Sequence, residues 1–214
     1  MFLDIGSTLI DDEDCVQERI ARIQESFLSS GVSISTREIR AAIEKAASEH
    51  APIPVFEGID GLPAPQRVRE RVKGEVGWRS ELERPYPEAK AVLSALSERY
   101  CLGIIANQSP GSEGRLKKHG LLSFITHCLA SAELGLNKPD PAIFKLALER
   151  AGCKPDEAVM IGDRIDNDIR PAKKLGWKTI RVRQGFCRGQ KPRSTDEEPD
   201  FEVEELKDIL DILL

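Results

Sequence analysis

The chain has 214 residues, of which 40% are hydrophobic and 31% charged, a composition typical of a folded globular protein. Its formal net charge of −5 comes from acidic and basic residues mixed along the sequence, so no nucleic-acid partner is expected. No apolar stretch approaches the roughly 18 residues that span a bilayer, and acidic residues from Asp4 onward argue against a signal peptide. We therefore expect a cytoplasmic protein with no membrane partner, present as a monomer or a homodimer.

The first elements in chain order are a strand and then a run of helices. Residues 1–3 are apolar and predict a short strand. Residues 11–85 show helical patterns and no convincing strand. The first helix is indicated by Val16, Ile20, Ile23 and Phe27. Ser35 and Glu38 form a capping-box pattern before a second helix. A third helix is expected after the Pro- and Gly-rich stretch 52–65, at Val68, Val72 and Val76. We interpret residues 11–85 as an inserted helical cap domain.

From residue 86 onward, short apolar runs alternate with amphipathic helices. Helices are expected over 89–99, 141–151 and 169–175, the second with Asp140 as its N-cap, Pro141 in its first turn and Gly152 as its stop. Strands are expected at 102–106, 127–130, 158–161, 179–182 and 201–203. This alternation predicts an α/β fold with a Rossmann-like, doubly wound parallel sheet covered on both faces. The α/β core domain would comprise residues 1–10 and 86–214.

Cysteine and histidine usage disfavours several classes of site. The five cysteines are dispersed and form no CxxC pair, so buried free thiols are expected rather than disulfides or a zinc site. The three histidines lie near no motif that would support a His-based triad. These residues are Cys15, Cys101, Cys128, Cys153, Cys187, His50, His119 and His127.

Polar residues follow several predicted strands, where the carboxyl ends of a parallel sheet bind ligands. Asp4 follows the first strand, and Asn107 and Gln108 follow the second strand of the core. Residues 162–168 follow a later strand and include Asp163 and Asp168, and Lys138 lies between these two groups in the sequence. Carboxylates, an amide and a lysine are thus predicted to converge at one edge of the sheet.

Four motifs in this order resemble those of the haloacid dehalogenase-like hydrolase superfamily, most of whose members are phosphatases. They are Asp4-Ile5-Gly6-Ser7-Thr8-Leu9, Leu102-Gly103-Ile104-Ile105-Ala106-Asn107, Lys138-Pro139-Asp140-Pro141, and Gly162-Asp163 with Asn167-Asp168. The resemblance covers nearly the whole chain, and the stretch 11–85 matches the position of the family's helical cap. It implies a hydrolase that acts on a small phosphorylated metabolite.

The resemblance also implies roles for individual residues. Asp4 would be the nucleophile that forms an aspartyl-phosphate, and Lys138 would neutralise phosphate oxygens. Repulsion between the carboxylate and a phosphate at 4 Å is about 4 kcal/mol for unit charges at an effective dielectric near 20, which a lysine and a divalent cation offset. Mg²⁺ would be bound by aspartate carboxylates and by the backbone carbonyl of residue 6. A second set of residues would bind the substrate. The metal set is Asp4, Gly6, Asp163 and Asp168; the substrate set is Thr8, Asn107, Gln108 and Lys138.

Two positions depart from the family pattern. Gly6 stands where the resemblance places an acid/base aspartate, and loss of a general acid typically costs about 10²–10⁴ in rate. Ala106 replaces a hydroxyl residue that would bind phosphate. Asp11 or Asp12 is a candidate replacement acid, with exposed linker acids as the alternative interpretation. We favour a phosphatase over a non-catalytic metal- or phosphate-binding module, and place a 2-haloacid dehalogenase third, because Asp163 and Asp168 indicate a metal that dehalogenases do not use.

Overall fold

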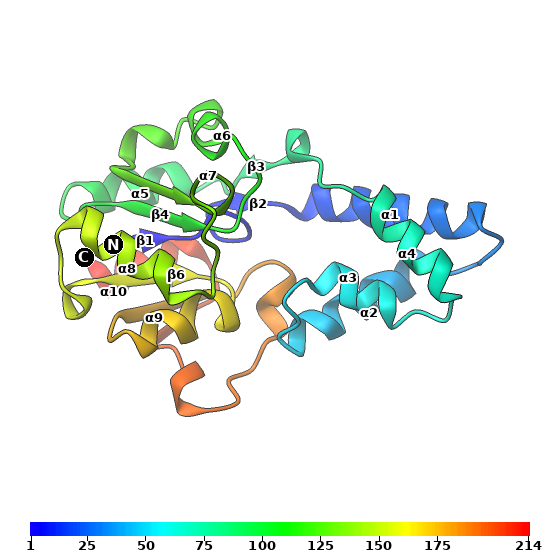
Figure 1. The fold of residues 1–214 in the computed structure, drawn as a ribbon. Helices are drawn as coiled ribbons and strands as arrows, with labels where there is room; N and C mark the ends of the chain where they lie inside the picture. Colours follow the sequence, from blue (N-terminus) through cyan, green and yellow to red (C-terminus); the bar gives the residue numbers. More distant parts are fainter. The chain divides into compact units, whose positions relative to one another are not determined.

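The computed structural model describes residues 1–214, which form two compact units (Figure 1). The first comprises Met1–Asp11 and Arg84–Leu214 and is called the α/β unit; the second comprises Asp12–Glu83 and is called the helical unit. These divisions lie close to the expected ones, 1–10 with 86–214 and 11–85. The chain therefore leaves the α/β unit once, directly after its first strand and turn, and returns once.

The α/β unit is built around a six-stranded sheet in which every strand runs parallel to its neighbours. The strand order is β5-β4-β1-β6-β7-β8, which confirms the doubly wound α/β fold. The bounds are β1 Phe2–Leu3, β4 Gly103–Ala106, β5 His127–Ala130, β6 Val159–Gly162, β7 Lys178–Val182 and β8 Phe201–Val203. A separate antiparallel pair, which the sequence patterns do not predict, consists of β2 Ile10–Asp11 and β3 Arg84–Pro85.

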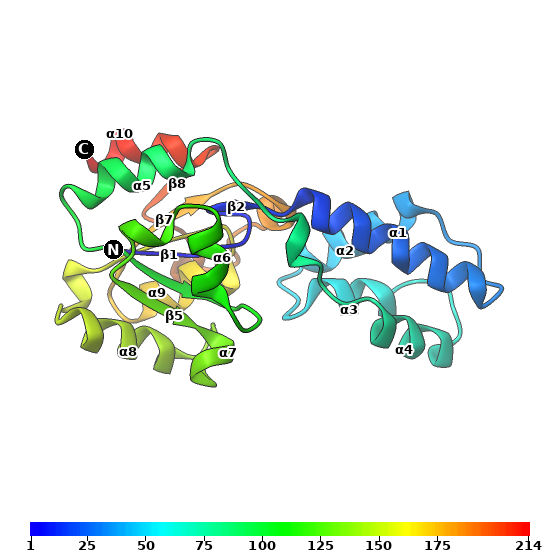
Figure 2. The ribbon, with the colours of Figure 1, turned by 90° about the horizontal axis from the view of Figure 1, so that it is seen from above.

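Two hydrophobic cores lie on opposite faces of the sheet. Successive residues of a strand point to opposite faces, so Leu3 and Ile104 belong to one core and Phe2 and Ile105 to the other. The first core packs against α5 and the C-terminal segment, and the second against α8 and α9. Figure 2 shows α5 and α10 on one side of the sheet and α8 on the other. The burial of both faces explains why the strands read as continuous apolar runs.

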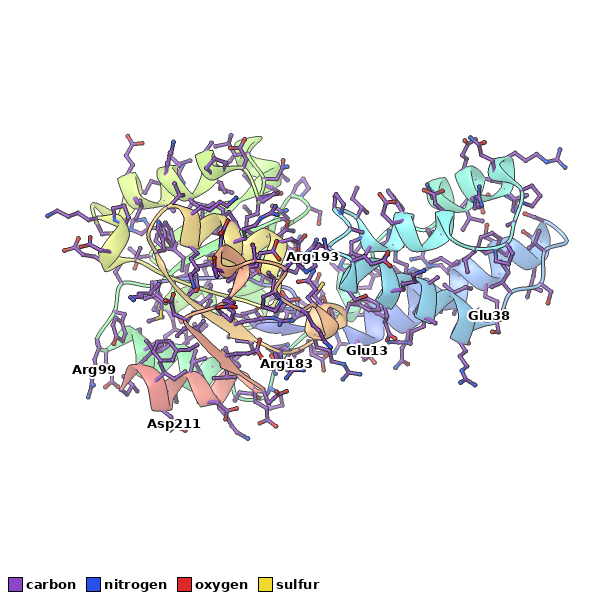
Figure 3. All side chains as sticks on the ribbon, turned by 90° about the horizontal axis from the view of Figure 1, so that it is seen from below. Glu13, Glu38, Arg99, Arg183, Arg193 and Asp211 are labelled. Atoms are coloured by element: carbon purple, nitrogen blue, oxygen red, sulfur yellow. The ribbon has the colours of Figure 1, made fainter.

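The helices of the α/β unit begin and end at identifiable signals. In α8, Asp140 accepts a hydrogen bond from the amide of Ala142 at 2.8 Å, Pro141 is the first residue, and Gly152 ends the helix in the left-handed region, as expected. Arg99, which is labelled in Figure 3, donates to the carbonyl of Leu214 at the C-terminus at 3.0 Å. The helices are α5 Ala89–Ser97, α6 Ser112–Lys118, α7 Ser131–Leu134, α8 Pro141–Ala151, α9 Arg170–Lys174 and α10 Leu210–Leu213.

Several short turns connect these elements. The helix expected over 169–175 is shorter than predicted, because α9 is preceded by a π-helical turn at Ile165–Ile169. The 3-10 turns are η2 Leu122–Phe124, η3 Pro155–Glu157, η5 Phe186–Gly189, η6 Thr195–Glu197 and η7 Leu206–Ile209. No helix of the structure combines the length and the apolar character needed to cross a membrane.

The helical unit packs four helices around an apolar core. The expected capping box is present at Glu38, which is labelled in Figure 3: its amide donates to Ser35 Oγ at 3.2 Å, and its carboxylate accepts from the Ser35 amide at 2.8 Å. One helix, α3, lies inside the Pro- and Gly-rich stretch where none was expected, because Pro54 occupies its first turn. The elements are α1 Glu13–Ser29, α2 Thr36–Ser48, α3 Pro54–Asp60, α4 Gln66–Glu75 and the 3-10 turn η1 Ser80–Leu82.

Candidate active site

The three central strands of the sheet deliver the predicted site residues to one edge. β1 pairs with β4 on one side and with β6 on the other. Asp4, Asn107 and Asp163 directly follow these three strands. The order of connection reverses here, since β4 and β5 extend the sheet in one direction and β6, β7 and β8 in the other. Such a switch point is where open α/β sheets bind ligands.

Asp4 lies at the start of a tight turn. Its amide donates to the carbonyl of Ile161 at 2.9 Å, which ties it to the end of β6. The carbonyl of Ile5 accepts hydrogen bonds from the amides of Leu9 and Ile10, both at 2.9 Å, and Ser7 has a positive φ of 51°. The Asp4 residue is 9% exposed, so its carboxylate is largely shielded from solvent.

Lys138 joins two carboxylates from different loops. Its Nζ lies 2.9 Å from Oδ1 of Asp4 and 2.5 Å from Oδ1 of Asp168, and its side chain is 1% exposed. The backbone of Lys138 is held by Asn107, whose Oδ1 accepts from the Lys138 amide and whose Nδ2 donates to the Lys138 carbonyl, both at 2.8 Å. This paired contact aims the ammonium group at the site.

Asp168 reaches the site from the π-helical turn. Its Oδ2 accepts from the amide of Arg164 at 3.0 Å, which folds the carboxylate back over the end of β6. A side chain on Gly162 would overlap the Asp168 carboxylate, so only glycine is compatible with this arrangement. The Gly-Asp sequence at the end of β6 is thus explained by packing against a residue six positions later.

Asp4, Asp163 and Asp168 each offer an oxygen within 4.8 Å of the others. Burial by itself would lower the pKa of Lys138, but Asp168 and Asp4 raise it overall, so the ammonium form is retained. Burial raises the pKa of Asp168 to about 6 against the opposing effect of Lys138, and the negative charge of Asp4 adds to the rise. Lys138 thus pairs with Asp4 and Asp168, and the three carboxylate oxygens that lie close together are ligands of the kind that suits a hard divalent cation.

Three residues that are expected to bind substrate differ in their surroundings. Thr8 is fully buried, and its Oγ1 has no hydrogen-bond partner. Gln108 is held by its neighbours: its amide donates to Ser131 Oγ at 3.1 Å and its Oε1 accepts from Arg115 at 3.0 Å. The Asn107 side chain binds the backbone of Lys138, and a role of Asn107 in substrate binding stays a prediction.

The sequence patterns miss a buried polar network behind the carboxylates. Arg181 on β7 is 1% exposed and donates from Nε to the carbonyl of Asp163 at 3.3 Å. Gln190 binds Asp166, whose pKa is held below its usual value by Arg164 and Gln190 although burial acts to raise it. A sequence signal existed, since an arginine within an apolar strand run requires buried partners.

Comparisons with known proteins identify the family and the fold of the chain. The sequence model of the haloacid dehalogenase-like hydrolases matches residues 1–176. A glyceraldehyde 3-phosphate phosphatase from Methanopyrus kandleri is 28% identical over the whole chain and 96% of its own length. A phosphoserine phosphatase from Thermus thermophilus is 34% identical over 68% of this chain and 57% of its own. The crystal structure of a predicted phosphoglycolate phosphatase from Haemophilus somnus, 19% identical, superimposes with a TM-score of 0.74, covering all of this chain and 96% of its own.

Proposed function

Because the chain belongs to the haloacid dehalogenase-like hydrolases, we propose that it is a Mg²⁺-dependent phosphatase acting through an aspartyl-phosphate at Asp4. The observation that carries the proposal is the position of Lys138 Nζ, 2.9 Å from Asp4 and 2.5 Å from Asp168, beside a cluster of three carboxylates. An ammonium group so placed supplies positive charge beside a carboxylate nucleophile and a cation site.

The substrate is proposed to be a small phosphorylated metabolite. The relatives named above are described as phosphatases of glyceraldehyde 3-phosphate and of phosphoserine, both small phosphate monoesters. The first of them is similar to this chain from end to end, so its likeness includes the helical unit as well as the α/β unit. We infer the same class of substrate, without selecting one compound, and keep the helical unit as the proposed cap.

In the proposed reaction, an oxygen of Asp4 attacks phosphorus and the bond from phosphorus to the leaving oxygen breaks. Lys138 supplies positive charge beside the attacking carboxylate and the transferred phosphoryl group. Mg²⁺ held by Asp4, Asp163, Asp168 and the Gly6 carbonyl would offset the remaining phosphate charge. Water then attacks the phosphorus of the aspartyl-phosphate, and the Asp4 carboxylate is regenerated together with inorganic phosphate.

A second candidate is a non-catalytic module that binds the cation or phosphate. It is favoured by Gly6 in the turn after Asp4 and by Ala106 at the end of β4, because neither residue offers a polar side chain. Release of inorganic phosphate from a panel of small phosphate esters, with and without Mg²⁺, tests both candidates. We expect Mg²⁺-dependent turnover that Asp4→Asn eliminates, because an amide cannot form the acyl-phosphate. A folded wild type that binds Mg²⁺ and releases no phosphate from any ester supports the module, and chloride release from haloacids without Mg²⁺ would support the dehalogenase.

A further inference from the structure

Residues 185–190, which follow β7, contact both loops that carry the carboxylates. This 185–190 segment begins at Gly185, whose φ is +62° and whose backbone lies against Ser7. A side chain on Gly185 would overlap the side chain of Ser7. Ser7 itself has φ 51° in the turn after Asp4, a conformation that costs free energy for a residue other than glycine. The contact therefore supports the turn that presents Asp4.

The other end of the segment holds the π-helical turn. The Gln190 residue is 2% exposed, and its Oε1 accepts from the amide of Ile165 at 2.8 Å while its Nε2 donates to Oδ1 of Asp166 at 2.8 Å. Asp166 also binds Arg164 at 2.5 Å. Ile165 and Asp166 belong to the same turn as Asp168, so Gln190 fixes the backbone from which Asp168 reaches Lys138.

Arg181 holds the 185–190 segment in place. Its guanidinium donates to the carbonyls of Cys187 at 2.8 Å and Gln190 at 3.0 Å, and to that of Asp163 at 3.3 Å. Glu202 on β8 balances its charge at 3.0 Å. A buried network whose members are all hydrogen-bonded specifies one arrangement, because each broken bond leaves a desolvated polar group.

We propose that Arg181 and Gln190 are positioning residues for cation binding, which act by fixing the turn of Asp4 relative to the turn of Asp163 and Asp168. The inference rests on the proposed metal site. The 185–190 segment contacts Ser7 at one end and Asp166 at the other, so its conformation sets the separation of the ligands contributed by the two turns. Partners that orient metal ligands typically change metal affinity about 10–100-fold when removed.

The test is the Mg²⁺ dissociation constant of Gln190→Ala, measured by titration calorimetry on the full chain. Gln190→Ala removes the bonds to Ile165 and Asp166 without changing the net charge, and we expect the constant to rise about 10–100-fold. Gln184→Ala is the matched control, because Gln184 lies just before the segment and its Oε1 has no hydrogen-bond partner. The control should bind Mg²⁺ like the wild type. Gln190→Met retains side-chain volume and replaces Gln190→Ala if that variant does not fold.

A second measurement separates positioning from general stability. The melting temperature of each variant in chelator reports its stability without the cation. The proposal is overturned if the Gln190 variant melts earlier than the wild type in chelator but binds Mg²⁺ with an unchanged constant. It is supported if the constant rises and the additional substitution Asp166→Asn has little further effect, because the two side chains act as one unit. A wild type that binds no Mg²⁺ contradicts the proposed metal site itself, which is a different outcome.

Discussion

Replacing Gly6 by aspartate should change which phosphorylated compounds the chain hydrolyses. Gly6 lies in the turn after Asp4, in a bridge with Ile10, and contributes no side chain. Lys138 and Asp168 are bound to each other. His127 begins β5, whose start pairs with the start of β4 at the opposite end of the strands from Asp4. A leaving oxygen therefore departs as an anion or takes its proton from solvent, unless Asp11 or Asp12 provides one.

The magnitude follows from the leaving group. Acyl and aryl phosphates have stable leaving anions and need little protonation, whereas alkyl phosphates release an alkoxide that needs it. A positioned general acid contributes about 10²–10⁴ in rate, or about 3–5 kcal/mol of barrier. We expect Gly6→Asp to raise kcat/KM for alkyl phosphates by this range and to change acetyl phosphate turnover little. Gly6 is not among the glycines with positive φ, so its φ angle does not stand against an aspartate.

The assay compares kcat/KM for acetyl phosphate and glycerol 3-phosphate with saturating Mg²⁺. Gly6→Asn is the matched control, because asparagine has the size of aspartate and cannot transfer the proton. Equal turnover of the two substrates by the wild type, or equal gains from aspartate and asparagine, would refute the reasoning. If Asp11→Asn or Asp12→Asn abolishes alkyl phosphate turnover in the wild type, a linker acid replaces the missing group.

Other residues give further tests. Lys138→Met breaks a buried ion pair and should destabilise the chain by about 3–5 kcal/mol, which lowers the melting temperature by roughly 6–20 °C. Lys145 is exposed, so the control Lys145→Met should change stability by less than about 0.5 kcal/mol. Equal melting temperatures of the two variants would contradict the buried ion pair. Asn107→Leu removes both hydrogen bonds to the Lys138 backbone and should lower kcat about 10–100-fold, with the affinity for Mg²⁺ little changed. An unchanged kcat would show that Asn107 does not position Lys138 for the reaction. Burial raises the pKa of the Cys15 thiol to about 12 and that of the Cys128 thiol to about 11, whereas the pKa of an unfolded cysteine is about 8.5. The stability that the two protonated thiols contribute is therefore complete below about pH 8.5 and is lost as the pH rises towards their folded pKa values. Exposed Cys101 should accordingly be alkylated first in the native chain near pH 8, and fast labelling of Cys15 mapped by mass spectrometry would argue against this burial.

The fold could be predicted because its signals are local. Each central strand is a buried apolar run, and α8 begins and ends at residues whose preferences act within a turn, namely Asp140, Pro141 and Gly152. The edge of the sheet that carries the site follows from strand direction alone, so Asp4 and Asp163 could be placed together before any distance was known. Helix α3 is not predicted because its local signal is ambiguous: a proline such as Pro54 occurs both in loops and in the first turn of a helix.

The parts of the site that could not be predicted depend on contacts between residues far apart in sequence. The resemblance implies that Asn107 binds substrate, but no pattern in the sequence shows that its side-chain amide matches the donor and acceptor of the Lys138 backbone, 31 residues away. A π-helical turn of five residues is too short to show a hydrophobic period in the sequence. In this turn the Asp168 carboxylate lies over Gly162, a contact that the sequence does not reveal.

Buried polar residues outside the motifs depend most on the hydrogen-bond partners that the fold supplies. A charged side chain costs several kcal/mol to desolvate without partners, so Arg181 on an interior strand requires acceptors wherever its guanidinium ends. The carbonyls of Cys187 and Gln190 supply them, and a segment without regular strand or α-helical structure is thereby held rigidly behind the carboxylates. Thr8 differs from Arg181, because its hydroxyl is buried in the turn after Asp4 and has no hydrogen-bond partner there. Because this hydroxyl has no hydrogen bond to lose, Thr8→Val should preserve or raise the melting temperature, and a loss of about 1 kcal/mol or more would contradict the unpaired hydroxyl.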